Sequence, residues 1–203
     1  MRVFVALRPA EPALEHLAAA LEDVRATSWP ALRWADPEQW HLTLAFRPDL
    51  PEGAVEAALE DLAAIATRHA PLSLQLSGAG VFSARTLWIG VGGQTDQLAA
   101  LMGERLLEVA DRPGGDGRER RRAHLTVARV SSRAPRAPRR RARGAAPPPD
   151  PTQLLLAEVV RALSVYRGPS WRAEELELVA SELGGGRSGG PRHEVLGTVP
   201  LGG

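Results

Sequence analysis

The chain has 203 residues, 44% of them hydrophobic, so it can bury the core of one domain with two lobes. Its formal net charge of +1 excludes a protein that is strongly basic overall, and the absence of Cys excludes disulfides, a thiol nucleophile and Cys-ligated metals. Neither a signal-peptide pattern nor an apolar run near the ~20 residues of a membrane span is present. We therefore expect a soluble, cytoplasmic protein with no membrane partner.

Hydrophobic periodicity predicts short strands and amphipathic helices along the whole chain. Residues 2–7 are apolar after Arg2 and indicate a buried first strand, whereas apolar positions three or four apart over residues 11–25 indicate a helix. Strict alternation over residues 72–77 indicates a half-exposed strand, which Gly78 and Gly80 should end. The predicted strands are residues 2–7, 32–34, 41–46, 72–77, 86–91, 124–129, 174–179 and 193–199, and the predicted helices are residues 11–25, 51–69, 97–109 and 153–163.

This order of elements predicts an α+β fold, with antiparallel sheets whose helices cover one side. Two stretches are expected to be loops: the charged residues 112–122 and the Arg- and Pro-rich residues 131–150, the second of them mobile. The arginines of the second loop could attract phosphates. However, the chain contains no Lys, so a compositional bias towards Arg explains them more simply.

The sequence His-Leu-Thr followed by an apolar residue occurs twice, with His41 and Thr43 in one copy and His124 and Thr126 in the other. Because side chains alternate along a strand, the His and Thr of each copy share one face, and the apolar residues face a core. The repeat therefore predicts two similar half-domains, each presenting one imidazole and one hydroxyl.

Paired histidines suit displacement at phosphorus, in which the nucleophile and the leaving group lie on opposite sides. An imidazole can serve as base or acid because its unperturbed pKa of ~6.5 lies near working pH, and threonine hydroxyls can donate to the non-bridging oxygens. The repetition favours this function over a structural role. It also favours it over metal binding, since neither copy has an acidic residue at a matching offset.

On these two motifs, the chain resembles the 2H phosphoesterase superfamily, and within it the RNA 2′,3′-cyclic phosphodiesterases, also called 2′-5′ RNA ligase-like proteins. The resemblance implies one bilobal α+β domain over residues 1–203, with two antiparallel sheets, helices on their outer sides and a central cleft with one motif per lobe. It also implies hydrolysis of 2′,3′-cyclic phosphate to a 2′-phosphomonoester without a metal or cofactor. Further similar segments are residues 1–7, 32–34, 87–91, 128–129 and 178–196.

The resemblance implies that His41 donates a proton to the leaving 3′ oxygen, that His124 is the proton acceptor that activates water, and that the threonines hold the phosphate. The repeat alone does not separate donor from acceptor. Phe46 and Arg129, five residues after each His, are implied to contact the nucleobase. Strict alternation would place them on the face opposite the histidines, so this contact requires a bend or bulge.

The implied partners are RNA with 2′,3′-cyclic phosphate ends, tRNA fragments among them, or cyclic nucleotides, acted on by a monomer. Two positions beside the motifs depart from the family pattern: Ala123 replaces the family's usual Pro, and Arg47-Pro48 replaces its usual Leu-Gly. The alternatives are a related 2H enzyme acting on another cyclic phosphate or on oligoadenylate, and a non-catalytic RNA-binding protein.

The three remaining histidines are not site candidates on sequence grounds. His16 and His69 fall on predicted helices and are expected to face solvent, and His193 has no Thr two residues later.

Overall fold

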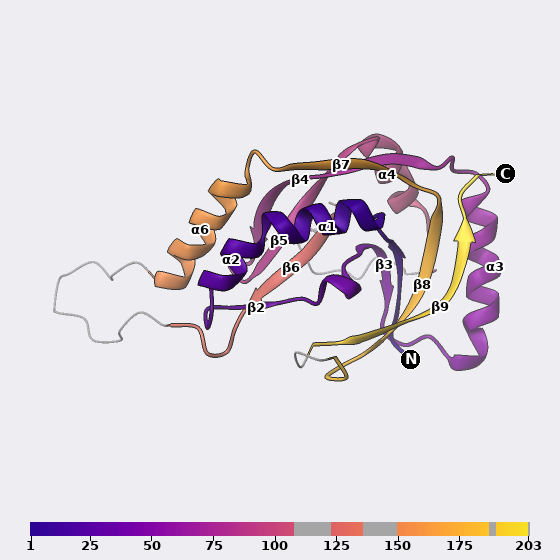
Figure 1. Ribbon diagram of the computed structural model, residues 1–203. Coiled ribbons are helices and arrows are strands. Elements are labelled where there is room, and N and C mark those ends of the chain that lie inside the picture. The colour runs from indigo at the N-terminus through magenta and orange to yellow at the C-terminus, as the bar shows by residue number, and fades with distance from the viewer. Residues whose placement is uncertain (108–122, 136–149, 187–189, 203) are drawn as a thin grey trace, which may run out of the picture.

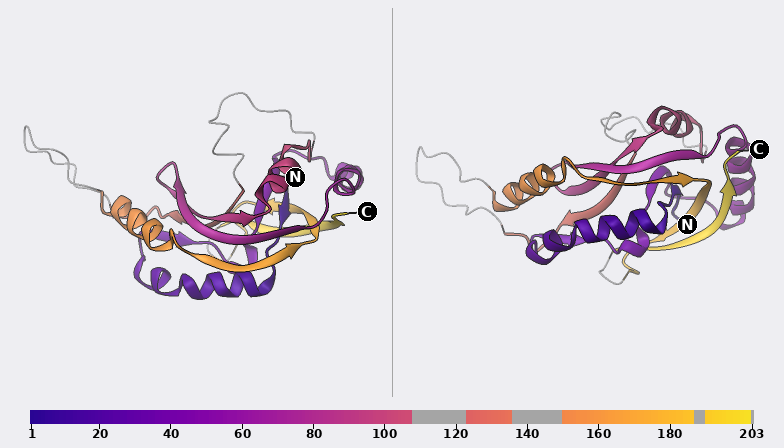
Figure 2. Two further views of the ribbon diagram at one scale, coloured as in Figure 1. Left: turned by 90° about the horizontal axis from the view of Figure 1, so that it is seen from above. Right: turned by 45° about the horizontal axis from the view of Figure 1, so that its top comes forward.

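The computed structural model describes residues 1–107, 123–135, 150–186 and 190–202 (Figure 1). The strands in these residues are β1 (Val3–Leu7), β2 (Leu32–Trp34), β3 (Leu42–Arg47), β4 (Leu72–Phe82), β5 (Thr86–Gly93), β6 (His124–Val130), β7 (Arg167–Ala173), β8 (Glu175–Glu182) and β9 (Arg192–Pro200). All nine join one antiparallel sheet in the order β7-β4-β5-β6-β3-β1-β8-β9, with β2 also pairing with β6. The strands are markedly curved, as both views in Figure 2 show.

The helices pack on the outer strands of both halves of this sheet, which confirms the predicted α+β class. Helix α1 packs mainly on β7 and α6 on β4, whereas α3 packs on β9, at the opposite end of the molecule from α6 (Figure 1). None of the described helices is long and apolar enough to cross a membrane. The described helices are α1 (Glu11–Ala20), α2 (Glu22–Thr27), α3 (Val55–Ala66), α4 (Thr95–Gly103) and α6 (Pro151–Leu163), with single 3-10 turns at Pro37–Gln39 and Glu52–Ala54.

The two predicted sheets are one continuous sheet, and its halves meet between β3 and β6. They are joined by the antiparallel pairing of Leu42 with Leu125, which we call the seam leucines; both are fully buried. Beyond this pair β3 and β6 diverge, and from Ala128 onward β6 pairs with β2 in place of β3. The seam thus places the two His-Leu-Thr copies on adjacent strands.

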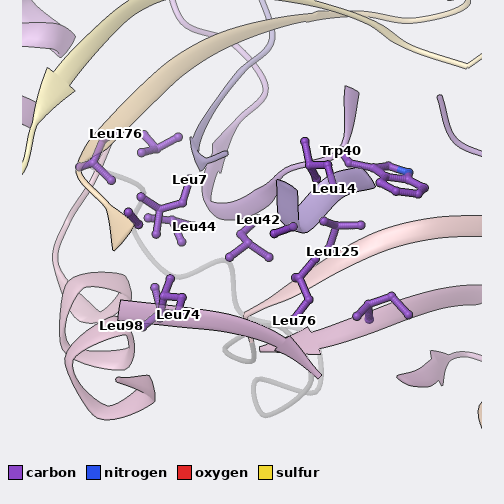
Figure 3. Close-up of a cluster of buried hydrophobic side chains, with 14 of the residues drawn as sticks. Leu7, Leu14, Trp40, Leu42, Leu44, Leu74, Leu76, Leu98, Leu125 and Leu176 are labelled. Carbon is purple, nitrogen blue, oxygen red and sulfur yellow. The ribbon is translucent and has the colours of Figure 1, made fainter. Parts of the chain in front are cut away.

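The hydrophobic core is shared by both halves of the sheet. Leu7, Leu44 and Leu176 from one half converge with Leu74 and Leu76 from the other (Figure 3). Full burial of one such side chain stabilises the fold by roughly 1.5–3 kcal/mol. One face of the sheet therefore carries the core, which leaves the other face for the polar residues of the two motifs.

Two strands depart from the sequence prediction. Strand β4 does not end at Gly78; this residue has a φ of 62° and occupies a bulge, after which pairing with β5 resumes. A side chain on Gly80 would overlap the ring of Trp88 on β5, so this glycine permits a close approach rather than a break. Strand β7 was not predicted because it lacks apolar alternation; it lies at the sheet edge, where Pro169 is tolerated.

The helix ends also differ from prediction. The predicted helix 11–25 is two helices that meet at Leu21, and the predicted helix 97–109 starts at Thr95 and ends at Gly103. The predicted charged loop 112–122 lies outside the described residues. Of the predicted loop 131–150, only residues 131–135 and 150 are described.

Candidate active site

The sheet register brings the four repeated polar residues together. Continuing the pairing of the seam leucines by one residue in each direction places His41 opposite Thr126 and Thr43 opposite His124. Because opposite residues of an antiparallel pair share a face, all four side chains project from the face that the seam leucines do not occupy. The two histidines therefore stand at diagonal corners of a small square, with a threonine at each of the other corners.

Matching bulges turn the ends of both motif strands. The pairing of β3 with β1 slips at Leu44, and the pairing of β6 with β5 slips at Val127; each is the third residue after the His of its motif. An extra residue in one strand reverses the alternation of the side chains that follow it. Consequently Phe46 and Arg129 come onto the same face as the histidines, as the predicted base contacts require.

A cavity of about 530 Å³ opens on this face of the sheet. Five of the six predicted site residues line it, namely His41, Thr43, Phe46, Thr126 and Arg129. The cavity also reaches β2 on one side and the ends of β8 and β9 on the other. The sixth residue, His124, is not part of the lining and lies beside the cavity on the same strand as Thr126.

His41 is held by a hydrogen bond and by contacts with neighbouring rings. Its Nδ1 lies 2.7 Å from the backbone oxygen of Gln39, to which it donates, and its ring stacks on Phe4 with centroids 4.5 Å apart. Burial lowers its pKa to about 4; the Gln39 hydrogen bond opposes this, and positive charge on His193, Arg8 and His124 adds to it. His41 is therefore neutral near pH 7, and with Nδ1 donating to Gln39 its Nε2 can accept a hydrogen bond.

His124 packs against two aromatic rings of nearby strands. Its ring lies edge-on to Phe82, with centroids 4.7 Å apart, and 6.2 Å from the ring of Trp88. Phe82 and Trp88 stack on each other with centroids 5.0 Å apart. Since a side chain on Gly80 would displace the Trp88 ring, Gly80 helps to fix the surface against which His124 packs.

Phe46 and Arg129 offer two flat surfaces at the cavity. The guanidinium of Arg2 lies 5.1 Å from the centroid of the Phe46 ring, a cation–π contact that covers one face of that ring. Phe46 remains 39% exposed. Arg129 of β6 is exposed and stands opposite Arg33 in the antiparallel pairing of β6 with β2. The remaining face of Phe46 and the Arg129 guanidinium are each suited to stacking on a planar group.

His193 was missed by the sequence analysis and lines the cavity. Its ring centroid lies 5.0 Å from that of His41 and 5.0 Å from that of Phe4, both in edge-on contacts. Nothing local in the sequence indicates this position, because it depends on the pairing of β9 with β8, in which His193 faces Ser181. The exclusion of His193 from the site is therefore corrected.

The other two histidines lie outside the site. His16 is exposed, with Nδ1 3.2 Å from the hydroxyl of Tyr166. The expectation that His69 faces solvent is wrong: its side chain is only 16% exposed and contacts the Glu104 carboxylate at 3.1 Å. Among the described residues, no three His, Asp or Glu side chains converge to form a metal site.

The lowered pKa of His41 predicts a specific loss of stability in acid. An unfolded His binds its proton at a pKa of ~6.5, whereas folded His41 does so at about 4, so the unfolded state binds more protons between these values. Stability is therefore unaffected above pH ~6.5 and falls as pH decreases towards 4. From about pH 7 to about pH 4.5, the wild type should lose about 2–3 kcal/mol more unfolding free energy than His41→Phe.

Urea unfolding of both proteins at the two pH values measures this difference. His16→Phe is the matched control, because His16 is exposed, and its loss should equal that of the wild type. An equal loss in the wild type and His41→Phe would contradict the buried, neutral state of His41.

The chain is similar to known phosphoesterases. The model of the family described as LigT like Phosphoesterase matches residues 7–91. An RNA 2′,3′-cyclic phosphodiesterase of Geobacillus stearothermophilus is 41% identical over 70 residues, which cover 32% of this chain and 22% of that protein. The match thus spans less than a quarter of that relative. An RNA 2′,3′-cyclic phosphodiesterase of Methanothermobacter thermautotrophicus is 26% identical over 189 residues, covering 90% of this chain and 91% of that protein.

The fold is also that of a solved structure. The crystal structure of the protein TT0787 of Thermus thermophilus superposes with a TM-score of 0.64 at 25% identity, and the match covers 100% of this chain and 99% of the other.

Proposed function

We propose that this chain, which matches the LigT-like phosphoesterase family over residues 7–91, hydrolyses 2′,3′-cyclic phosphates at RNA ends to 2′-phosphomonoesters without a metal. The observation that carries this proposal is the register at the seam, where each motif His lies opposite the Thr of the other motif. A phosphate bound over this square would have one imidazole on each side and one hydroxyl near each non-bridging oxygen. The names of the similar proteins support the same activity.

In the proposed reaction, His124 takes a proton from a water molecule as that water attacks phosphorus. The new P–O bond forms in line with the P–O3′ bond, which breaks, and His41 gives a proton to the departing 3′ oxygen. The 2′ oxygen stays on phosphorus, so the product is a 2′-phosphomonoester. Thr43 and Thr126 donate hydrogen bonds to the non-bridging oxygens, where negative charge resides in the transition state.

The lowered pKa of His41 fits a proton donor that becomes protonated when the phosphate binds. Burial lowers this pKa to about 4, so the ring is neutral near pH 7. A phosphate anion beside the ring favours the protonated form and raises the pKa again. The hydrogen bond from Nδ1 to Gln39 persists in both forms, so the transferable proton is the one on Nε2.

The proposed substrates are RNA 3′ ends and tRNA fragments that carry the cyclic phosphate, as well as free 2′,3′-cyclic nucleotides. Phe46 and Arg129 would stack on the terminal base, which binds any base without reading its hydrogen-bonding edge. The arginines on the cavity wall, Arg2, Arg33 and Arg129, supply positive charge for the polyanion.

The test is hydrolysis of an RNA oligonucleotide with a 2′,3′-cyclic phosphate end by purified protein in EDTA, with the phosphate position of the product mapped. We expect turnover to a 2′-phosphate, with a bell-shaped pH profile. A 3′-phosphate product would contradict the proposed bond cleavage. Turnover only of oligoadenylate or of another cyclic phosphate would support a sister activity. RNA binding without turnover between about pH 5 and 8, a range that spans the ordinary pKa of His, would indicate a binding protein.

A further inference from the structure

We propose that His193 is a positioning residue for His41: its ring holds the His41 imidazole against Phe4 and the Gln39 carbonyl, which leaves Nε2 of His41 for the substrate. This inference rests on the proposed function. His41 then has three identified neighbours. Phe4 stacks on its ring, the Gln39 carbonyl accepts from its Nδ1, and His193 makes an edge contact with it.

The rings of Phe4, His41 and His193 form a cluster in which each ring contacts the other two. His193 makes edge contacts with both His41 and Phe4, at interplanar angles of 75° and 73° and centroid distances of 5.0 Å each. Edge-to-face contacts at such distances are favourable and have a preferred geometry. Because each ring touches the other two, a movement of His41 away from Phe4 would also disturb its edge contact with His193.

The chemistry of His193 argues that its ring does more than fill space. Its Nδ1 is buried and has no hydrogen-bond partner among the described residues. Leaving a buried polar atom unsatisfied costs on the order of 1–3 kcal/mol, so an apolar ring would suit packing alone better. Packing alone therefore does not explain an imidazole at this position.

Charged and titratable groups surround His41 from several elements. His193 approaches from β9, Arg8 follows β1, and His124 lies on β6; each disfavours a positive charge on His41. Glu177 of β8 pairs with Ala6 of β1 and carries its carboxyl on the sheet face of the histidines. Burial raises the pKa of this carboxyl, although Arg8 opposes that rise.

Burial also lowers the pKa of His193 itself. Two adjacent imidazoles disfavour double protonation, because like charges in a desolvated site repel each other. His193 therefore adds to the larger effect of burial in lowering the pKa of His41.

The experiment compares His193→Ala and His193→Phe in the full chain. Loss of the ring in His193→Ala should lower kcat roughly ten- to a hundredfold, with a smaller change in KM, because a misplaced catalytic group loses rate rather than binding. Phenylalanine should restore most of kcat, because it retains the edge contacts. In His193→Phe the titration midpoint of the His41 imidazole, followed by NMR, should nevertheless move to higher pH, because a repelling neighbour has been removed.

The NMR titration reports on the His41–His193 pair even if the protein turned over no cyclic phosphate, so failure of this inference differs from failure of the proposed function. An unchanged His41 midpoint in His193→Phe would overturn the inference, as would wild-type kcat in a folded His193→Ala. If the alanine variant fails to fold, the phenylalanine variant still decides. His16→Phe is the matched control and should change neither kcat nor the His41 midpoint.

Discussion

Replacement of either His41 or His124 by alanine is expected to lower kcat by roughly 10²–10⁴-fold, and the double variant should lose little more than the worse single variant. The reason is geometric: the seam register places the two imidazoles at diagonal corners, so that one can act on each side of a phosphorus atom. Proton removal and proton donation then belong to one step. When either group is absent, the other has little left to accelerate.

Single-turnover hydrolysis of a 2′,3′-cyclic nucleotide by the two single variants, the double variant and His16→Ala measures this effect. His16 is exposed and contacts Tyr166, so its loss should leave kcat unchanged. Two independent, multiplicative losses would contradict the concerted step. A kcat within tenfold of the wild type in either single variant would remove that histidine from the chemistry, since general acid–base catalysis contributes more than this.

The central part of the site could be predicted because it depends on local alternation. His and Thr two residues apart share a face in any strand, and the apolar residue between them fixes which face is buried. The structure agrees: the seam leucines are buried and the threonines line the cavity. The need for a bulge before Phe46 and Arg129 could also be deduced, but not its position. That position is set by the pairing of β3 with β1 and of β6 with β5, which is not a local property.

His193 could not be predicted because its place in the site depends on a register between distant strands. The pairing of β9 with β8 brings His193 beside Ser181, and that of β8 with β1 places this part of the sheet next to Phe4. Strand β7 was missed for a related reason. As an edge strand it is stabilised by its pairing with β4 and by burial of Trp171, not by an alternating pattern of its own.

Removal of the two proposed stacking surfaces is the second large effect that we expect. Stacking of a base on an aromatic ring contributes roughly 1–3 kcal/mol, so Phe46→Ala should lower kcat/KM by about 5- to 150-fold, mainly through KM. Arg129→Ala should act in the same direction. Phe46→Tyr should retain activity because it keeps the ring, whereas Arg129→Lys should not, because an ammonium group has no planar face to stack.

A substrate without a base separates stacking from a supporting role of these two side chains in the catalytic geometry. Ribose 2′,3′-cyclic phosphate presents the same reacting atoms but nothing for Phe46 or Arg129 to stack on, so both alanine variants should hydrolyse it as fast as the wild type. Equal losses on the nucleotide and on the baseless substrate would show instead that these side chains support the square of histidines and threonines. The bulges at Leu44 and Val127 make the first outcome the expected one. They turn Phe46 and Arg129 towards the cavity while the residues that precede them remain in register with the seam.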